Sequence, residues 1–376
     1  MKLTLKIYSL LFLSFIVLHS ADCYLNVCAD TGTKELNISA ESASLMLCDS
    51  GEVIFSKNAD IPLPMASTTK IMTAIVALEV CDLDKLVTVH ADAVGTEGSS
   101  AYLMLGESLT MRDLLYALML QSANDAAVAI AYDVAGGIDE FAELMNAKAE
   151  KLGLVSTHFT NPHGLDSDGH FTTANELACL ASYAMLNSSF REIVSTDRYV
   201  TEGGRVFVNH NKLLGLYDGA VGIKTGFTKK SGRCLVSAAE RDGLLAVAVT
   251  LDAADDWNDH KKMLDYCFMN YEAATLAEIG QYAVDIPCIG GNKSTVRCSN
   301  TEALSLTMSK GSEVSVTIEA DRYFPAPVKA GDALATAKFY SEGELVAVLP
   351  LYAETDVTVK EGKLSLLDRI LRFIGR

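Results

Sequence analysis

A helix-patterned block between two groups of strand-like segments constrains the fold more than any other feature of the chain. Residues 43–55 hold two short apolar runs around Asp49-Ser50-Gly51, a pattern that predicts a hairpin. Residues 67–186 are mainly helix-patterned, and segments rich in β-branched residues return within residues 206–251. We therefore predict a sheet whose strands are far apart in sequence, with the helical block packed on it.

Start and stop signals define the individual elements. Thr110 is expected to cap one helix, Thr173 and Glu176 have the spacing of a capping box, and Gly136-Gly137 is expected to end a helix. The expected helices are residues 71–80, 111–120, 125–134, 138–152, 174–186 and 258–271, and the returning strands are residues 206–208, 222–225, 234–238 and 244–251.

The pattern changes again beyond residue 280. Val and Ile there alternate with Ser and Thr, as in Val314-Ser-Val-Thr-Ile318, which predicts a small all-β domain at residues 283–360. The first domain is expected to span residues 35–275. A net charge of −17, from 48 acidic and 31 basic residues, argues against a nucleic-acid partner, because phosphate affinity needs clustered Lys and Arg.

The two ends of the chain carry targeting patterns. Lys2 and Lys6 precede an apolar run followed by small residues, which predicts a signal peptide at residues 1–29, cleaved after Ala21 or Ala29, and an exported protein; an uncleaved anchor is the alternative. Residues 363–376 divide into an apolar and an Arg-containing half at helical spacing. This pattern predicts a peripheral helix on the outer surface of the membrane, through residues 364–376, or a helix docked on the β domain.

The nine cysteines show no disulfide framework. Cys288 and Cys298 bracket a Gly-rich turn and are the best candidates for a disulfide. Cys179, Cys234 and Cys267 lie in apolar patterns and are expected to be buried thiols.

Three short motifs that contain residue types used in catalysis occur in this order: Ser67-Thr-Thr-Lys70, Ser122-Ala-Asn124 and Lys224-Thr-Gly226. An offset of three residues at a helix start places Ser67 and Lys70 on one face. A serine needs an adjacent base, and a lysine serves as that base only when burial and nearby positive charge lower its pKa. The helix after Lys70 offers the burial, and Lys224 offers the charge.

The remaining motif residues suit substrate handling. Ser122 is placed to relay a proton to a leaving amine, and Asn124 to offer its amide to substrate and also cap the next helix. A strand that contains Thr225 and Gly226 suits docking of an extended peptide, because Gly226 has no side chain to block close approach.

Together these motifs resemble the signature of penicillin-binding proteins and class A β-lactamases. The sequence around these motifs is similar to that of serine-type D-alanyl-D-alanine carboxypeptidases, the low-molecular-mass penicillin-binding proteins. The matching stretches are Pro64-Met-Ala-Ser-Thr-Thr-Lys70, Asn161-Pro-His-Gly-Leu165, Gly169-His-Phe-Thr-Thr173, Gly222-Ile-Lys-Thr-Gly-Phe-Thr228 and Lys262-Met-Leu-Asp-Tyr266. The resemblance implies an α+β fold with the sheet and helical block of these families, followed by a small β domain.

The resemblance also implies roles. Ser67 would attack the carbonyl between the terminal D-alanines of a peptidoglycan stem peptide, and Lys70 would take its proton. The backbone N–H groups of Ser67 and Phe227 would hold the oxyanion, and Lys224 and Thr225 would receive the terminal carboxylate. β-Lactams would acylate the same serine, and no cofactor or metal is expected.

Two departures from the family pattern are visible. Phe227 stands where relatives often carry Tyr or His, and Leu251-Asp-Ala-Ala-Asp-Asp-Trp257 lacks the family's carboxylate-binding arginine. A serine β-lactamase is the alternative enzyme, but residues 156–170 lack a glutamate to activate a deacylating water. A non-catalytic cell-wall module is the alternative outside catalysis. His158, His163 and His170 lie in a loop with Pro and Gly, without the spacing of zinc peptidases.

Overall fold

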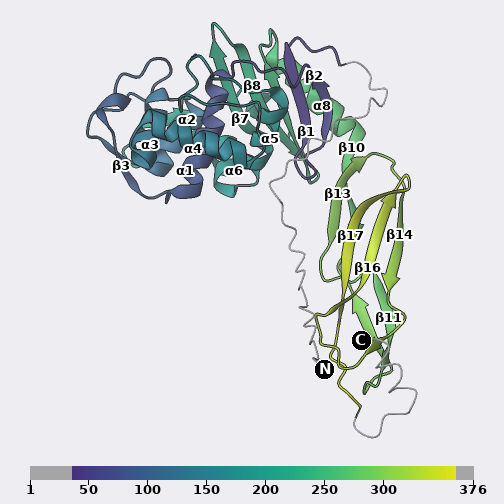
Figure 1. The fold of residues 1–376 in the computed structure, drawn as a ribbon. Coiled ribbons are helices and arrows are strands. Elements are labelled where there is room, and N and C mark those ends of the chain that lie inside the picture. The colour runs from purple at the N-terminus through teal and green to yellow at the C-terminus, as the bar shows by residue number, and fades with distance from the viewer. Residues whose placement is uncertain (1–35, 361–376) are drawn as a thin grey trace, which may run out of the picture. The chain divides into compact units, whose positions relative to one another are not determined.

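The computed structural model describes residues 36–360, which form two compact units (Figure 1). The first holds residues 36–239 and 246–264, and the second holds residues 240–245 and 265–360. The predicted signal peptide and the predicted C-terminal helix lie outside the described residues. No helix within residues 36–360 has the length and apolarity needed to cross a bilayer.

The first unit contains a five-stranded sheet in the order β2-β1-β9-β8-β7. Strand β1 lies between its hairpin partner and a strand from the far end of the unit, with Leu45 opposite Phe55 on one side and Ala248 on the other. All six residues of β1 are buried, so it is a central strand. The predicted sheet of sequence-distant strands is confirmed. The strands are β1 (Ser42–Leu47), β2 (Val53–Lys57), β7 (Ala220–Thr228), β8 (Gly232–Arg241) and β9 (Leu244–Leu251).

The helical block follows the predicted elements closely. Thr110 caps α2 in a full capping box with Asp113, and Gly136 ends α3 with a φ of +84°. The capping box predicted at α5 is only half formed: Thr173 accepts from the Glu176 N–H, but the Glu176 carboxylate accepts from residues 156 and 157 instead. The helices are α1 (Lys70–Val80), α2 (Met111–Leu120), α3 (Asn124–Ala135), α4 (Ile138–Lys151), α5 (Ala174–Met185), α6 (Ser188–Ser195), α7 (Leu213–Leu216) and α8 (Asp256–Asn270).

The remaining elements of the first unit are short. The 3-10 turns are η1 (Ala66–Thr69) and η2 (Ala91–Ala93), and the two-stranded ribbons pair β3 (Leu86–Thr88) with β4 (Ser108–Thr110) and β5 (Arg198–Val200) with β6 (Val206–Val208). Helix α8 packs on the sheet through His260, whose ring bridges the hydroxyl groups of Ser237 on β8 and Thr250 on β9.

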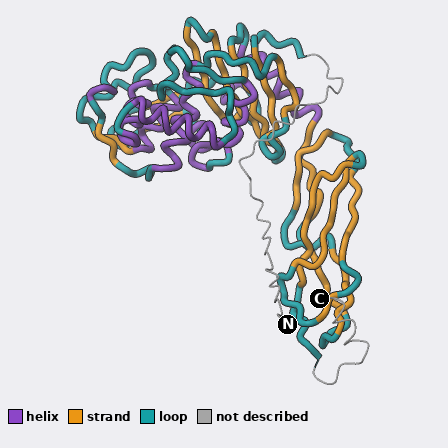
Figure 2. Tube along the Cα trace, in the orientation of Figure 1, coloured by secondary structure: helices purple, strands orange, loops and turns teal. Residues whose placement is uncertain are grey.

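The second unit confirms the predicted all-β domain. Beyond α8 the described chain consists of strands and loops (Figure 2). A six-stranded sheet in the order β14-β16-β17-β12-β11-β15 accompanies a two-stranded β10–β13 pair, and Phe339 and Leu351 lie in their shared core. The strands are β10 (Tyr271–Ala277), β11 (Ala283–Ile289), β12 (Thr295–Ser299), β13 (Leu304–Ser309), β14 (Val314–Ala320), β15 (Phe324–Pro325), β16 (Ala333–Ser341) and β17 (Glu344–Ala353).

Two expectations about cysteines are wrong. Cys288 and Cys298 are buried in the core of the β unit and are not joined in a disulfide. Their strands β11 and β12 pair so that Val284, not Cys288, lies opposite Cys298. Cys179 is disulfide-bonded, although its neighbours on α5 are apolar and buried. Cys234 and Cys267 are buried and form no disulfide, as predicted.

Candidate active site

The turn that carries Ser67 lies directly before helix α1. Ser67 belongs to the 3-10 turn η1, and Lys70 opens α1 one turn later. The Lys70 Nζ donates to the Ser67 Oγ at 2.9 Å, which confirms the predicted shared face. The preceding residue, Ala66, has a φ of +48°, and its carbonyl accepts from the Thr69 hydroxyl at 2.8 Å. The turn that carries Ser67 is therefore fixed by its own side chains.

Lys70 is fully buried, and each of its three possible donors has an acceptor. Its Nζ lies 2.9 Å from the Ser67 Oγ, 2.7 Å from the Asn124 Oδ1 and 2.5 Å from the His163 carbonyl oxygen. Burial lowers the pKa of Lys70 well below its usual value, the nearby Lys224 charge lowers it further, and Asp125 opposes both. A neutral Lys70 keeps two donors for Asn124 and His163 and turns its lone pair to Ser67.

A loop behind Ser67 supplies the His163 carbonyl. The Asn161 Oδ1 accepts from the Gly164 N–H at 2.7 Å and so closes the loop. Gly164 has a φ of +88°, and a Cβ there would lie 1.9 Å from the Ala66 carbonyl oxygen. This close approach of two backbones explains why glycine occupies the position, and it transmits the position of the loop directly to the turn that carries Ser67.

The histidines of this loop have structural contacts. The Nδ1 atom of His170 accepts from the Thr160 N–H, so its Nε2 donates to the Thr69 hydroxyl at 2.7 Å. Burial lowers the pKa of His163 to about 3 and that of His170 to about 4, which keeps both neutral. Within residues 36–360 no cluster of three His, Cys, Asp or Glu side chains has a metal-binding arrangement.

Ser122 and Asn124 lie on the opposite wall. Ser122 is 6% exposed and has a φ of +59°. The Asn124 amide is held between two groups, because its Nδ2 donates to the Glu97 carbonyl at 2.5 Å while its Oδ1 accepts from Lys70. The predicted capping role of Asn124 is wrong: Asn124 is the first residue of α3, and the N-cap residue is Ala123. Its side chain orients Lys70 instead.

Strand β7 forms the third wall. Lys224 is 1% exposed, its Nζ donates to the Thr225 carbonyl at 2.9 Å, and burial lowers its pKa to about 7. A Cβ at Gly226 would lie 3.1 Å from the Ser67 backbone nitrogen. Gly226 therefore lets β7 approach the turn that carries Ser67. The side chain of Phe227 is 66% exposed at the rim.

A cavity of about 370 Å³ connects these walls. Ser67, Ser122, Thr225, Gly226 and Phe227 line it, so the structure brings these predicted residues together around one space. Lys70, Asn124 and Lys224 lie buried beside it, in contact with each other or with lining residues. The sequence reasoning missed six lining residues, namely Ser99, His210, Lys212, Arg233, Asp256 and Trp257.

Comparison with known proteins identifies the family of this chain. A family model described as D-alanyl-D-alanine carboxypeptidase matches residues 29–255, more than half of the chain. The chain belongs to the D-alanyl-D-alanine carboxypeptidase family. These enzymes are serine-type hydrolases, and the predicted resemblance is confirmed. A second model, described as the C-terminal domain of penicillin-binding protein 5, matches residues 271–359.

Relatives of this carboxypeptidase-family chain align over most of its length. D-alanyl-D-alanine carboxypeptidase DacF of Bacillus subtilis is 32% identical over 90% of this chain and 91% of its own length. DacC of Escherichia coli is 33% identical over 85% of both chains. The crystal structure of penicillin-binding protein 5 from Haemophilus influenzae matches with a TM-score of 0.70 and 27% identity, covering 87% of this chain and all of that chain.

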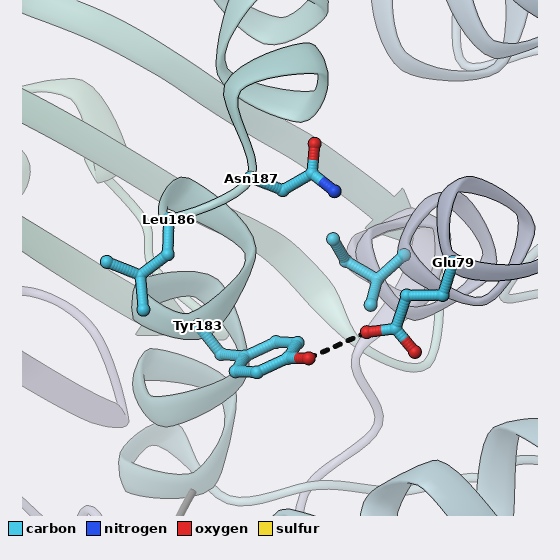
Figure 3. A pocket seen from close by; sticks show the side chains of 5 residues that line it. Glu79, Tyr183, Leu186 and Asn187 are labelled. Carbon is cyan, nitrogen blue, oxygen red and sulfur yellow. Dashed lines mark hydrogen bonds between the residues drawn. The ribbon is translucent and has the colours of Figure 1, made fainter. Parts of the chain in front are cut away.

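The carboxypeptidase-family unit has a second, smaller cavity of about 230 Å³ between the end of α1 and the end of α5 (Figure 3). The Tyr183 hydroxyl points across it and donates to the Glu79 carboxylate at 2.7 Å. Lys148 on α4 donates to both of these side chains. The side chains of Glu79, Tyr183 and Lys148 thus pair with one another. This smaller cavity lies at the opposite end of α1 from Lys70, so we assign it a packing role.

Proposed function

We propose that this protein removes the terminal D-alanine from peptidoglycan stem peptides through an acyl-enzyme at Ser67. The observation that carries the proposal is the contact of the Ser67 Oγ with a fully buried Lys70 whose pKa is lowered. A lowered pKa makes a lysine a better proton acceptor for a neighbouring hydroxyl than an ordinary surface lysine is. The family's activity and the named relatives support the same reaction.

The proposed acylation step uses the groups around the cavity in sequence. The Ser67 Oγ attacks the carbonyl carbon between the two D-alanines, and its proton passes to the Lys70 Nζ. The resulting oxyanion accepts from the backbone N–H groups of Ser67 and Phe227, which the close packing at Gly226 brings near each other. The carbon–nitrogen bond then breaks, and Ser122 relays the proton to the departing amine.

Deacylation and substrate docking complete the proposed cycle. Water adds to the acyl-enzyme with Lys70 as base, which releases the shortened peptide and restores the Ser67 hydroxyl. Asn124 and Gly226 bind the peptide, Thr225 binds its terminal carboxylate, and the buried charge of Lys224 attracts that carboxylate. Thr225 is partly exposed and lines the cavity, which leaves it accessible to substrate. β-Lactams are proposed to acylate Ser67 by the same first step.

We further propose that the protein acts outside the cytoplasm as a peripheral membrane protein. The apolar run behind Lys2 and Lys6 supports export, and the named relatives are cell-wall enzymes. The amphipathic pattern of residues 364–376 supports attachment to the outer membrane surface. Co-sedimentation with anionic vesicles, compared between the mature chain and a version ending at residue 360, tests this attachment; equal sedimentation would contradict it.

The activity test uses the chain without residues 1–29 and the tripeptide diacetyl-L-Lys-D-Ala-D-Ala. We expect release of free D-alanine, together with covalent labelling by a fluorescent penicillin. Ser67→Ala should abolish both signals, because no other hydroxyl is placed against Lys70 in the described chain. Full peptide hydrolysis by Ser67→Ala would refute the mechanism, and labelling without release would indicate a transpeptidase or a binding module.

A further inference from the structure

A carboxypeptidase has to recognise a free carboxylate one residue beyond the bond that it cleaves. The family position expected to supply an arginine, within residues 251–257, contains none. Lys224 is 1% exposed and already donates to a backbone carbonyl, so it offers a buried charge more than an accessible donor. The cavity therefore needs another cationic donor near Thr225 if it is to bind a carboxylate firmly.

Arg233 has the required position. It lies on β8 directly opposite Phe227 of β7, and it lines the same cavity as Ser67 and Thr225. Side chains of directly opposed residues share one face of a sheet, and diagonal neighbours lie about 7–8 Å apart. Arg233 is the diagonal neighbour of Thr225, since Thr225 is opposite Leu235. This spacing between Thr225 and Arg233 leaves room for a carboxylate that binds the Thr225 hydroxyl on one side and the Arg233 guanidinium on the other.

The guanidinium of Arg233 is oriented and still accessible. Its Nη2 donates to the Asp256 Oδ1 at 2.7 Å, and the Asp256 side chain is only 6% exposed at the start of α8. The Arg233 side chain is 46% exposed. Within residues 36–360 this is the hydrogen bond that the guanidinium makes, so four of its five N–H donors are available for a ligand.

We propose that Arg233, held in place by Asp256, is the carboxylate-binding arginine of this enzyme. The inference rests on the proposed function and names the residue that reads the free end of its substrate. Asp256 is a positioning residue: it anchors one edge of the guanidinium and leaves the remaining edges for the planar, two-point contact that arginine makes with carboxylates. Asp256, one of the two adjacent acidic residues at the family's arginine position, thus supports an arginine on β8.

The test compares acylation by benzylpenicillin, which has a carboxylate, with acylation by its methyl ester, which has none. We expect Arg233→Gln to slow acylation by benzylpenicillin about 10- to 100-fold, the loss expected for a hydrogen bond between charged groups. Acylation by the ester should be unchanged. Arg233→Lys should recover part of the rate, and Asp256→Asn should lower the acid-to-ester ratio in the same direction by a smaller factor.

Arg198→Gln is the matched control, because it removes an exposed strand arginine of the same unit that does not line the cavity. It should leave the acid-to-ester ratio unchanged. An equal loss with both β-lactams, or no loss with either, would overturn the assignment of Arg233. D-alanine release by the unaltered enzyme is measured alongside: its absence would refute the proposed function, whereas the β-lactam ratio would still decide the role of Arg233.

Discussion

The contact between Gly164 and Ala66 allows a sharp test of how the site is built. In Gly164→Ala, the new Cβ would lie 1.9 Å from the Ala66 carbonyl oxygen, whereas ordinary contact begins at 3.4 Å. The two backbones therefore have to separate by about 1.5 Å, and Ala66 directly precedes Ser67. A misplacement of about 1 Å typically costs about 100-fold in rate. We expect acylation by a fluorescent penicillin to slow by about that factor.

The same substitution also lowers stability through two separable terms. A left-handed backbone costs a residue with a Cβ about 1–2 kcal/mol, and overpacking adds about 1–3 kcal/mol. Gly153→Ala isolates the first term, because Gly153 has a φ of +73° and no atom within 4 Å of the added Cβ. Urea unfolding should therefore show a loss of about 1–2 kcal/mol in Gly153→Ala and about 2–5 kcal/mol in Gly164→Ala.

The two variants together test whether the loop that contains Gly164 controls the position of Ser67. Gly153→Ala should acylate at the unaltered rate, because a Cβ at this position, in the turn after α4, makes no contact with the turn that carries Ser67. If Gly164→Ala acylates as fast as Gly153→Ala, then the loop does not control the position of Ser67, and the proposed coupling of the two backbones is wrong.

Two further predictions concern protonation. Neutral Lys70 is the proposed base, and after burial the charge of Lys224 is the next cause that lowers its pKa. Lys224→Met should therefore raise the pKa of Lys70 and shift the acid limb of the acylation-rate profile to higher pH, whereas Lys224→Arg should not. An unshifted limb in Lys224→Met would contradict this. His163, His170 and His260 are buried with pKa values lowered to about 3, 4 and 3, so between about pH 4 and 6.5 only the unfolded chain binds their protons. The free energy of unfolding measured in urea should therefore fall with decreasing pH in this window, by up to about 1.4 kcal/mol per pH unit for each histidine, and His260→Gln should show a shallower slope.

Local patterns in the sequence determine much of the fold and part of the site. The offset between Ser67 and Lys70 is one helical turn, so their contact follows from a helix start alone. The cap at Thr110 is likewise a local event. The predictions from the sequence are wrong where a side chain binds a distant partner instead of a local one. The Glu176 carboxylate serves residues 156 and 157 rather than its own helix end, and the sequence contains no sign of that competition.

The same reason explains the missed half of the cavity. Arg233 and Asp256 belong to a strand and a helix start that meet only in the folded sheet. Neither lies in a motif, and Arg233 is about twenty residues from residues 251–257 along the chain, although its guanidinium meets Asp256 in the fold. The pairing of Phe227 with Arg233 was accessible in principle, because a tight turn joins β7 to β8, but it requires the strand register.

Backbone strain gives the site its final constraint. Left-handed conformations are unfavourable for Ala, Ser and Tyr, and the described chain uses them at Ala66, Ser122 and Tyr102. Ala66 precedes Ser67, Ser122 lines the cavity, and Tyr102 lies three residues after Ser99, which also lines the cavity. Each conformation costs about 1–3 kcal/mol and persists only where surrounding contacts over-determine it. The buried Asp125 carboxylate, which accepts from the backbone of residues 101 and 103, is such a contact. These strained conformations lower the stability of the fold, and they occur in three separate segments around the larger cavity. Such fixed geometry is what a preorganised acyl-transfer site requires.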